Sequence, residues 1–133
     1  MNKILEQLGE YGIVPVVVLN RVEDAKPLAK ALCDGGCKCA EVTFRTDAAE
    51  ESIKIMSEEY PEMLVGAGTV LTIDQVDRAV NAGAKFIVDD GAAAVSPHPT
   101  TVVTLISVAN NKTTILFFII RILPGDFLGF SVF

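Results

Sequence analysis

Three residues able to act on a small carboxylate stand near the ends of two short apolar segments. Glu41 and Arg45 belong to the segment 41–46, and Thr69 follows a Gly-Ala-Gly sequence in the segment 65–70. Each segment is typical of a strand that stops on a polar residue or a tight glycine turn before a helix begins. In α/β proteins, ligands bind at the carboxyl ends of parallel strands, because the loops there converge. A carboxylate, a guanidinium and a hydroxyl at such ends suit a small carboxylate substrate.

The elements that position these residues form a regular series. After a short helix over 2–10, the unbroken apolar run 13–19 predicts a strand buried on both faces, as in a parallel sheet covered by helices. Further strands are expected over 39–44, from 63 to the glycines at 66–68, and over 85–88. The helices between them are expected over 24–32, from Asp47 as N-cap to before Pro61, and from Thr72 as N-cap to Gly83. Three βα units and a fourth strand predict an α/β fold with right-handed crossovers.

Charge is distributed unevenly along the chain. Residues 1–91 hold 16 of the 17 acidic and 9 of the 11 basic residues, and only Lys112, Arg121 and Asp126 are charged after them. Soluble domains average about 25% charged residues. We therefore expect a single domain over 1–133, with βα units in 1–91 and a divergent apolar segment in 92–133. Residues 101–109 fit a strand or a β-rich helix. Residues 115–123 predict a buried strand, since they fall short of the ~20 residues that span a bilayer.

Composition also argues against several classes of function. The net charge of −6 and the absence of a basic run make a nucleic-acid partner unexpected. The charged N-terminus lacks the apolar core of a secretory signal, so a cytoplasmic protein without a membrane partner is expected. Cys33, Cys37 and Cys39 lack the paired spacing of a zinc site, and His98 is the only histidine. We expect buried or half-buried reduced thiols and no metal.

Residues 12–88 resemble the aldolases of 2-keto-3-deoxy-6-phosphogluconate (KDPG) and 4-hydroxy-2-oxoglutarate (KHG). The resemblance rests on four motifs: Val14-Pro15-Val16; Ala31-Leu32 followed by Gly35-Gly36; Glu41-Val42-Thr43-Phe44-Arg45-Thr46; and Val65-Gly66-Ala67-Gly68-Thr69-Val70-Leu71 with Ala82-Gly83-Ala84. It implies a partial TIM-type (β/α) barrel, a homo-oligomer that in this family is usually a trimer, and no cofactor. The implied class I reaction splits a 2-keto acid into pyruvate and an aldehyde through a lysine Schiff base.

The resemblance also implies a role for each candidate residue. Glu41 corresponds to the general acid and base, Arg45 to the group that holds the substrate carboxylate, and Thr69 to a hydroxyl in the same pocket. From the residues alone, other interpretations remain open. Glu41 and Arg45 fit a salt-bridged pair, and the Gly-Ala-Gly-Thr sequence fits a simple tight turn.

The chain departs from the family pattern after residue 88. Its fourth strand ends in Asp89-Asp90-Gly91 where the family has Ser-Pro-Gly, and the segment 120–129 resembles the Schiff-base segment with Arg121 in the lysine's place. A guanidinium stays protonated above pH ~12, so Arg121 cannot form an imine. We therefore expect a protein that descends from the lyases of the aldolase family. Its chain is expected to be truncated or altered, and its activity to be impaired. The alternative is a non-catalytic half-barrel that binds a small carboxylate or self-associates through open strand edges.

Overall fold

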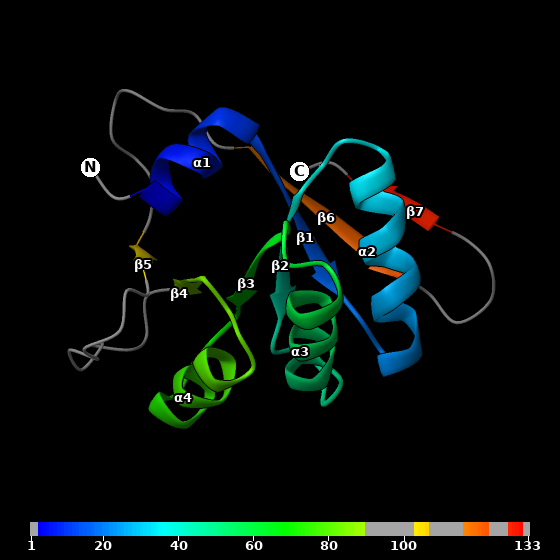
Figure 1. Ribbon diagram of the computed structural model, residues 1–133. Helices are drawn as coiled ribbons and strands as arrows, with labels where there is room; N and C mark the ends of the chain where they lie inside the picture. The colour runs from blue at the N-terminus through cyan, green and yellow to red at the C-terminus, as the bar shows by residue number, and fades with distance from the viewer. Residues whose placement is uncertain (1–2, 90–102, 107–115, 123–127, 132–133) are drawn as a thin grey trace.

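The computed structural model describes residues 3–89, 103–106, 116–122 and 128–131 (Figure 1). Predictions that concern the other residues, including the Asp90-Gly91 turn and His98, lie outside the described part. The elements follow in the order α1 (Lys3–Tyr11), β1 (Ile13–Val18), the 3-10 turn η1 (Val22–Asp24), α2 (Ala25–Asp34), β2 (Cys39–Thr43), α3 (Ala49–Glu59), β3 (Leu64–Gly68), α4 (Ile73–Asn81), β4 (Phe86–Asp89), β5 (Val103–Ile106), β6 (Leu116–Ile122) and β7 (Leu128–Ser131).

The described strands form one sheet with the order β5-β4-β3-β2-β1-β6-β7. Strands β1 to β4 are parallel and adjacent in chain order, and each is separated from the next by a helix, as in a (β/α) barrel. β5 pairs in parallel with β4, whereas β7 is antiparallel to β6. The predicted three βα units and fourth strand of a TIM-type fold are thus confirmed.

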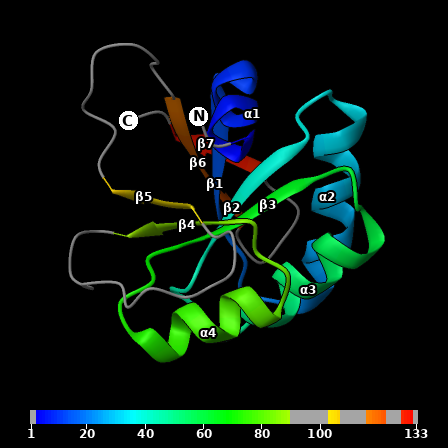
Figure 2. The same ribbon diagram turned by 60° about the vertical axis from the view of Figure 1, so that its left-hand side comes forward.

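Three helices cover one face of this sheet. Figures 1 and 2 show α2, α3 and α4 following one another along it, with α1 apart from them. Because successive strand residues point to opposite faces, Val17, Val42 and Val65 pack with these helices in the larger core. On the other face, a smaller cluster joins Leu8 of α1 to strand residues. Its buried members are Leu8, Val14, Cys39, Leu64 and Phe86.

Two local predictions are corrected by longer-range contacts. β3 continues through the Gly-Ala-Gly sequence instead of stopping there, and the Phe86 ring covers Gly66 so closely that a Cβ on Gly66 would lie 2.5 Å from Phe86 Cδ2. α3 has Ala48, not Asp47, as its N-cap, without a capping side chain. The backbone closes this turn itself, since Ala49 N donates to Thr46 O at 3.3 Å. Thr72 does cap α4, accepting a hydrogen bond from Gln75 N at 3.2 Å.

Two of the strands beyond β4 resolve the predictions for the C-terminal segment. Residues 103–106, the described part of 101–109, are the strand β5, so of the two predicted alternatives these four residues form the strand. The expected strand over 115–123 is β6, which lies beside β1 in Figure 1 and pairs with it in parallel from Ile13↔Leu116 to Val18↔Arg121. β6 therefore extends the sheet on the side of β1 away from β2.

The three cysteines are free thiols, as predicted. Cys39 is buried, and Cys33 and Cys37 are half-buried. The Cys39 thiol donates to the carbonyl of Ile13 at 3.2 Å, which ties the start of β2 to the start of β1. Burial, with the neighbouring Cys37 thiol as a second cause, raises the pKa of Cys39 to about 12. Cys39 is thus a packing residue rather than a nucleophile.

Candidate active site

Glu41 is a buried acidic residue on the sheet face opposite α2–α4. Only 4% of it is exposed, and its strand pairs Glu41 with Gly66 and Thr43 with Gly68. The Glu41 side chain lies directly over Gly68, so that a Cβ on Gly68 would stand 2.5 Å from the Glu41 carboxyl carbon. The missing side chain of Gly68 therefore creates the space that the carboxylate occupies.

Arg45 is held in the turn that follows β2. Its predecessor Phe44 donates its backbone N–H to Gly68 O at 2.8 Å, and the Thr46 hydroxyl donates to Leu19 O beyond the end of β1. One neighbour of Arg45 is thus bonded to β3 and the other to the residue that follows β1, while Arg45 itself is exposed. An exposed guanidinium on a fixed turn is available to a ligand at this end of the sheet.

Thr69 directly follows Gly68 and has an unusual backbone. Its φ of +53° makes it the one described non-glycine residue in the left-handed region. A β-branched residue rarely adopts this conformation, because its Cβ crowds the following carbonyl. Such strain is found where surrounding structure enforces a functional geometry. Thr69 is half-buried beside the position where the Glu41 carboxylate lies over the strand.

Gly68 is where three of the four predicted site residues converge. Glu41 lies over it, the Arg45 turn is bonded to its carbonyl, and Thr69 follows it. For Arg121 the backbone position is described: it pairs with Val18 at the carboxyl end of β1, and β1 separates it from β2. The described part of the chain holds no cluster of three or more His, Cys, Asp or Glu side chains suited to a metal ion.

Sequence reasoning overlooked two other features of this site. Thr43 is buried and its hydroxyl donates to Val17 O at 3.1 Å, which locks β2 to β1 beside Glu41. The sequence predicts a turn at Gly66 and Gly68, although their spacing of two places both on one face of a strand. That spacing is the signal from which their role beneath Phe86 and Glu41 could have been recognised.

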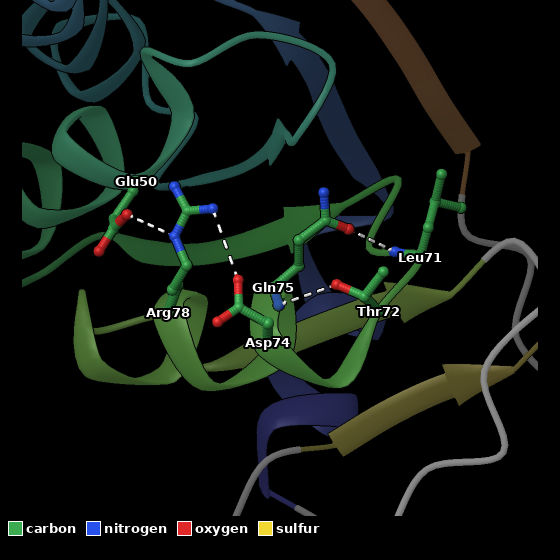
Figure 3. Close-up of polar contacts among 6 residues, drawn as sticks. All are labelled: Glu50, Leu71, Thr72, Asp74, Gln75 and Arg78. Carbon is green, nitrogen blue, oxygen red and sulfur yellow. Dashed lines mark hydrogen bonds and ion pairs between the residues drawn. The ribbon is translucent and has the colours of Figure 1, made fainter.

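A polar cluster on α4 borders the site. Arg78 Nε donates to Glu50 Oε2 of α3 at 2.7 Å, and Arg78 Nη1 lies 3.8 Å from Asp74 Oδ2 (Figure 3). The Arg78 guanidinium also lies over the Phe44 ring, 5.8 Å from its centroid. At the start of the helix, Gln75 Oε1 accepts from Leu71 N at 2.7 Å, so the strained Thr69 leads into a well-capped helix.

This arrangement has the parts for proton transfer next to a bound carboxylate. A carboxylate shielded from water can take a proton from, and return it to, a substrate carbon or oxygen within hydrogen-bond reach. A guanidinium can hold a planar carboxylate through two parallel hydrogen bonds. None of the helices that the structure describes is long and apolar enough to cross a membrane.

Comparison with known proteins gives consistent matches. The chain matches the family model "KDPG and KHG aldolase" over residues 4–113. It is 41% identical over 137 aligned residues to a 2-dehydro-3-deoxy-phosphogluconate aldolase of Treponema pallidum (strain Nichols), which covers 97% of this chain and 65% of that protein. The matched region therefore extends past the closely matching motifs of residues 12–88 and includes most of the C-terminal segment.

Solved structures agree with these matches. The KDPG aldolase of Zymomonas mobilis ZM4, solved with 3-phosphoglycerate, has a TM-score of 0.64 and 45% identity over 71% of this chain and 44% of that chain. The KDPG aldolase of Legionella pneumophila, in which pyruvate was captured as a covalent carbinolamine, has a TM-score of 0.60 and 39% identity over 66% and 45%. The chain spans less than two thirds of the length of each of these relatives.

Proposed function

Because this chain belongs to the KDPG and KHG aldolase family, we propose that its residues around Gly68 bind the pyruvate part of a 2-keto acid in the manner of a class I aldehyde-lyase. Glu41 moves protons at the pyruvate methyl carbon, Arg45 holds the carboxylate, and Thr69 supplies a hydroxyl. The observation that carries the proposal is the convergence of all three residues on Gly68, with Glu41 buried over it.

The reaction of such a site is cleavage of KDPG or 4-hydroxy-2-oxoglutarate to pyruvate and an aldehyde. A lysine amine attacks the keto carbon, and the resulting imine withdraws the electrons released when the carbon–carbon bond breaks. The pyruvate carbinolamine in the Legionella relative supports this route for the family. Glu41 takes the proton of the substrate's 4-hydroxyl as the carbon–carbon bond breaks and the aldehyde forms, then gives a proton to the pyruvate carbon, and water hydrolyses the imine to release pyruvate and the free lysine.

This chain has Arg121 at the position that we assign to the Schiff-base lysine. Arginine cannot replace lysine there, because its protonated and delocalised guanidinium is not a nucleophile. We therefore propose that the chain keeps carboxylate binding and proton transfer but is impaired in imine formation. Lys112 is the only lysine in the sequence of residues 92–133 and is therefore the candidate for a surrogate.

Borohydride trapping tests this proposal. The purified chain is incubated with pyruvate, reduced with sodium borohydride and analysed by intact mass and peptide mapping, after its fold is verified by circular dichroism. We expect no covalent pyruvate adduct, together with reversible pyruvate binding that is weakened in Arg45→Ala. An adduct on one lysine would overturn the assignment of Arg121, and Lys112→Ala would then show whether Lys112 carries it.

A second candidate function is self-association without catalysis. The described strands form an open sheet that ends at β5 and β7, and exposed sheet edges invite pairing with another chain. A homo-oligomer formed through these edges would leave the site around Gly68 as a carboxylate-binding site only. Sedimentation velocity separates the two: a monomer at all concentrations contradicts self-association, whatever the outcome of trapping.

A further inference from the structure

The Arg45 turn receives support from a residue outside the aldolase motifs. Arg78 stands 33 positions later, in α4, and its guanidinium lies over the ring of Phe44, the residue before Arg45. A guanidinium over an aromatic face within about 6 Å is attracted by the ring's electrons. Phe44 is half-buried and packs against the larger core, so its ring offers Arg78 a firm surface.

Acidic groups fix Arg78 in this position. Glu50 Oε2 accepts from Arg78 Nε at 2.7 Å, and Asp74 Oδ2 lies 3.8 Å from Arg78 Nη1 (Figure 3). The hydrogen bond to Glu50 is the first cause that raises the Arg78 pKa, followed by the charges of Glu50, Asp74 and Asp47. The hydrogen bond at Nε fixes the orientation of the planar guanidinium, whereas the ammonium group of a lysine rotates freely and has no plane to fix.

The contacts around Phe44 then form a continuous path from α4 to Arg45. The Arg78 guanidinium of α4 lies over the Phe44 ring, and the Phe44 backbone N–H donates to Gly68 O of β3 at 2.8 Å. Thr46 is fastened to Leu19 O on the other side of Arg45. Without Arg78, one of these three attachments of the turn would be lost.

We propose that Arg78 is a positioning residue for Arg45: stacked on Phe44 and paired with Glu50, it fixes the turn that presents Arg45 to the carboxylate of a 2-keto acid. This inference rests on the proposed role of Arg45 as the carboxylate-binding group. The Arg78–Glu50 pair between α3 and α4 is half-exposed, and an exposed ion pair contributes little to stability. The proposal gives this pair a role in positioning instead.

A double-mutant cycle on pyruvate binding tests the inference. Pyruvate is titrated into the full chain by NMR for the wild type, Arg45→Ala, Arg78→Ala and the double variant. Arg45→Ala is expected to weaken binding at least ~10-fold, since hydrogen bonds to charged groups are strong. Arg78→Ala is expected to weaken it ~3-fold, and the double variant no further than Arg45→Ala. Losses that multiply in the double variant would overturn the inference.

Matched controls separate positioning from general stability. Arg21→Ala removes another exposed arginine in an ion pair, that with Asp24, and is expected to leave pyruvate binding unchanged. Glu50→Gln keeps the size of the Arg78 partner and is expected to weaken binding ~2-fold in a chain that folds normally. If Arg78→Ala behaves as Arg21→Ala does, Arg78 has no positioning role.

Amide hydrogen exchange keeps the inference testable apart from the proposed function. We expect faster exchange of the Phe44 amide, which donates to Gly68 O, in Arg78→Ala and unchanged exchange in Arg21→Ala. If the wild type does not bind pyruvate, the proposed function fails, and faster exchange at the Phe44 amide still supports the fixing of the turn by Arg78. If pyruvate binds but exchange at the turn is unchanged, the positioning inference fails alone.

Discussion

At the scale of single residues, the left-handed backbone of Thr69 lowers the stability of the fold while it fixes the position of the side chain. Its φ of +53° costs a β-branched residue about 1–2 kcal/mol. We predict that Thr69→Gly raises the free energy of unfolding by about 1 kcal/mol, because glycine adopts this backbone without strain. The same variant is expected to weaken pyruvate binding. Urea denaturation and NMR titration measure the two effects.

Serine is the matched control for Thr69, since Thr69→Ser keeps the hydroxyl and removes the β-branch. We expect Thr69→Ser to retain pyruvate binding while relieving part of the strain. A fall in stability in Thr69→Gly would show that the left-handed backbone is not strained by its side chain.

Ionisation of the Cys39 thiol makes the free energy of unfolding depend on pH in the alkaline range. Burial raises its folded pKa from 9.0 to about 12, so between these values the unfolded chain has lost the proton and the folded chain retains it. The folded state then binds more protons, and the free energy of unfolding falls as pH rises above 9. Below pH 9 the contribution is fully present. Urea denaturation from pH 8 to 11 should show this fall.

Cys39→Ala is expected to reduce the alkaline slope, because alanine does not ionise. Part of the slope should persist, since burial also raises the pKa of Tyr11, whose ionisation acts in the same direction. Equal slopes in the two proteins would mean that the Cys39 thiol ionises in the folded chain as easily as in the unfolded one.

At the scale of elements, the sequence predicts what depends on neighbours in the chain. Apolar runs, helical spacing and the Thr72 cap located β1, β2, β4 and α2–α4 to within a few residues. It did not predict that β3 continues through Gly66 and Gly68, because the reason lies in Phe86 and Glu41 on other strands. The Arg78–Phe44 stacking was not predictable either, since no local pattern joins residues 34 positions apart.

The glycines of β3 can be tested by adding one methyl group. Gly68→Ala places a Cβ against the Glu41 carboxylate, so we predict a loss of about 1–3 kcal/mol in the free energy of unfolding and weaker pyruvate binding. Gly35→Ala is the control: the φ of −78° at Gly35 suits alanine, and its Cβ would lie 3.2 Å from Ala31 O, a tight contact that needs only a small shift, so its effect should stay within about 1 kcal/mol. Unchanged stability in Gly68→Ala would show that Glu41 moves aside at no cost.

At the scale of the whole molecule, β6 joins the two compositional parts of the chain. It pairs with β1 over six residue pairs, from Ile13↔Leu116 to Val18↔Arg121. We therefore propose that residues 1–133 form a single domain, although charge nearly vanishes after residue 91. In this view the C-terminal segment covers the β1 edge that would otherwise be open to another chain.

A proline in β6 tests this proposal. Ile120→Pro, opposite Val17, removes a backbone donor within a strand paired on both sides, so we predict a loss of at least about 1–3 kcal/mol and increased self-association. Ile120→Val, which keeps the donor and a β-branched side chain, is the control. Denaturation and sedimentation velocity give both readouts. If Ile120→Pro is as stable as Ile120→Val, the C-terminal segment is not part of the domain.

The pairing of β1 with β6 also has a consequence for biosynthesis. The amino-terminal partner leaves the ribosome long before the other, because Val18 and Arg121 are 103 positions apart. At about 5–20 residues per second, this separation leaves the β1 edge without β6 for roughly 5–20 s. Strands β2, β3 and β4 can assemble on the other side of β1 during that time. The β1 edge of the nascent chain is therefore open to aggregation until β6 has been synthesised, and a chaperone that shields β1 would help the chain during this interval.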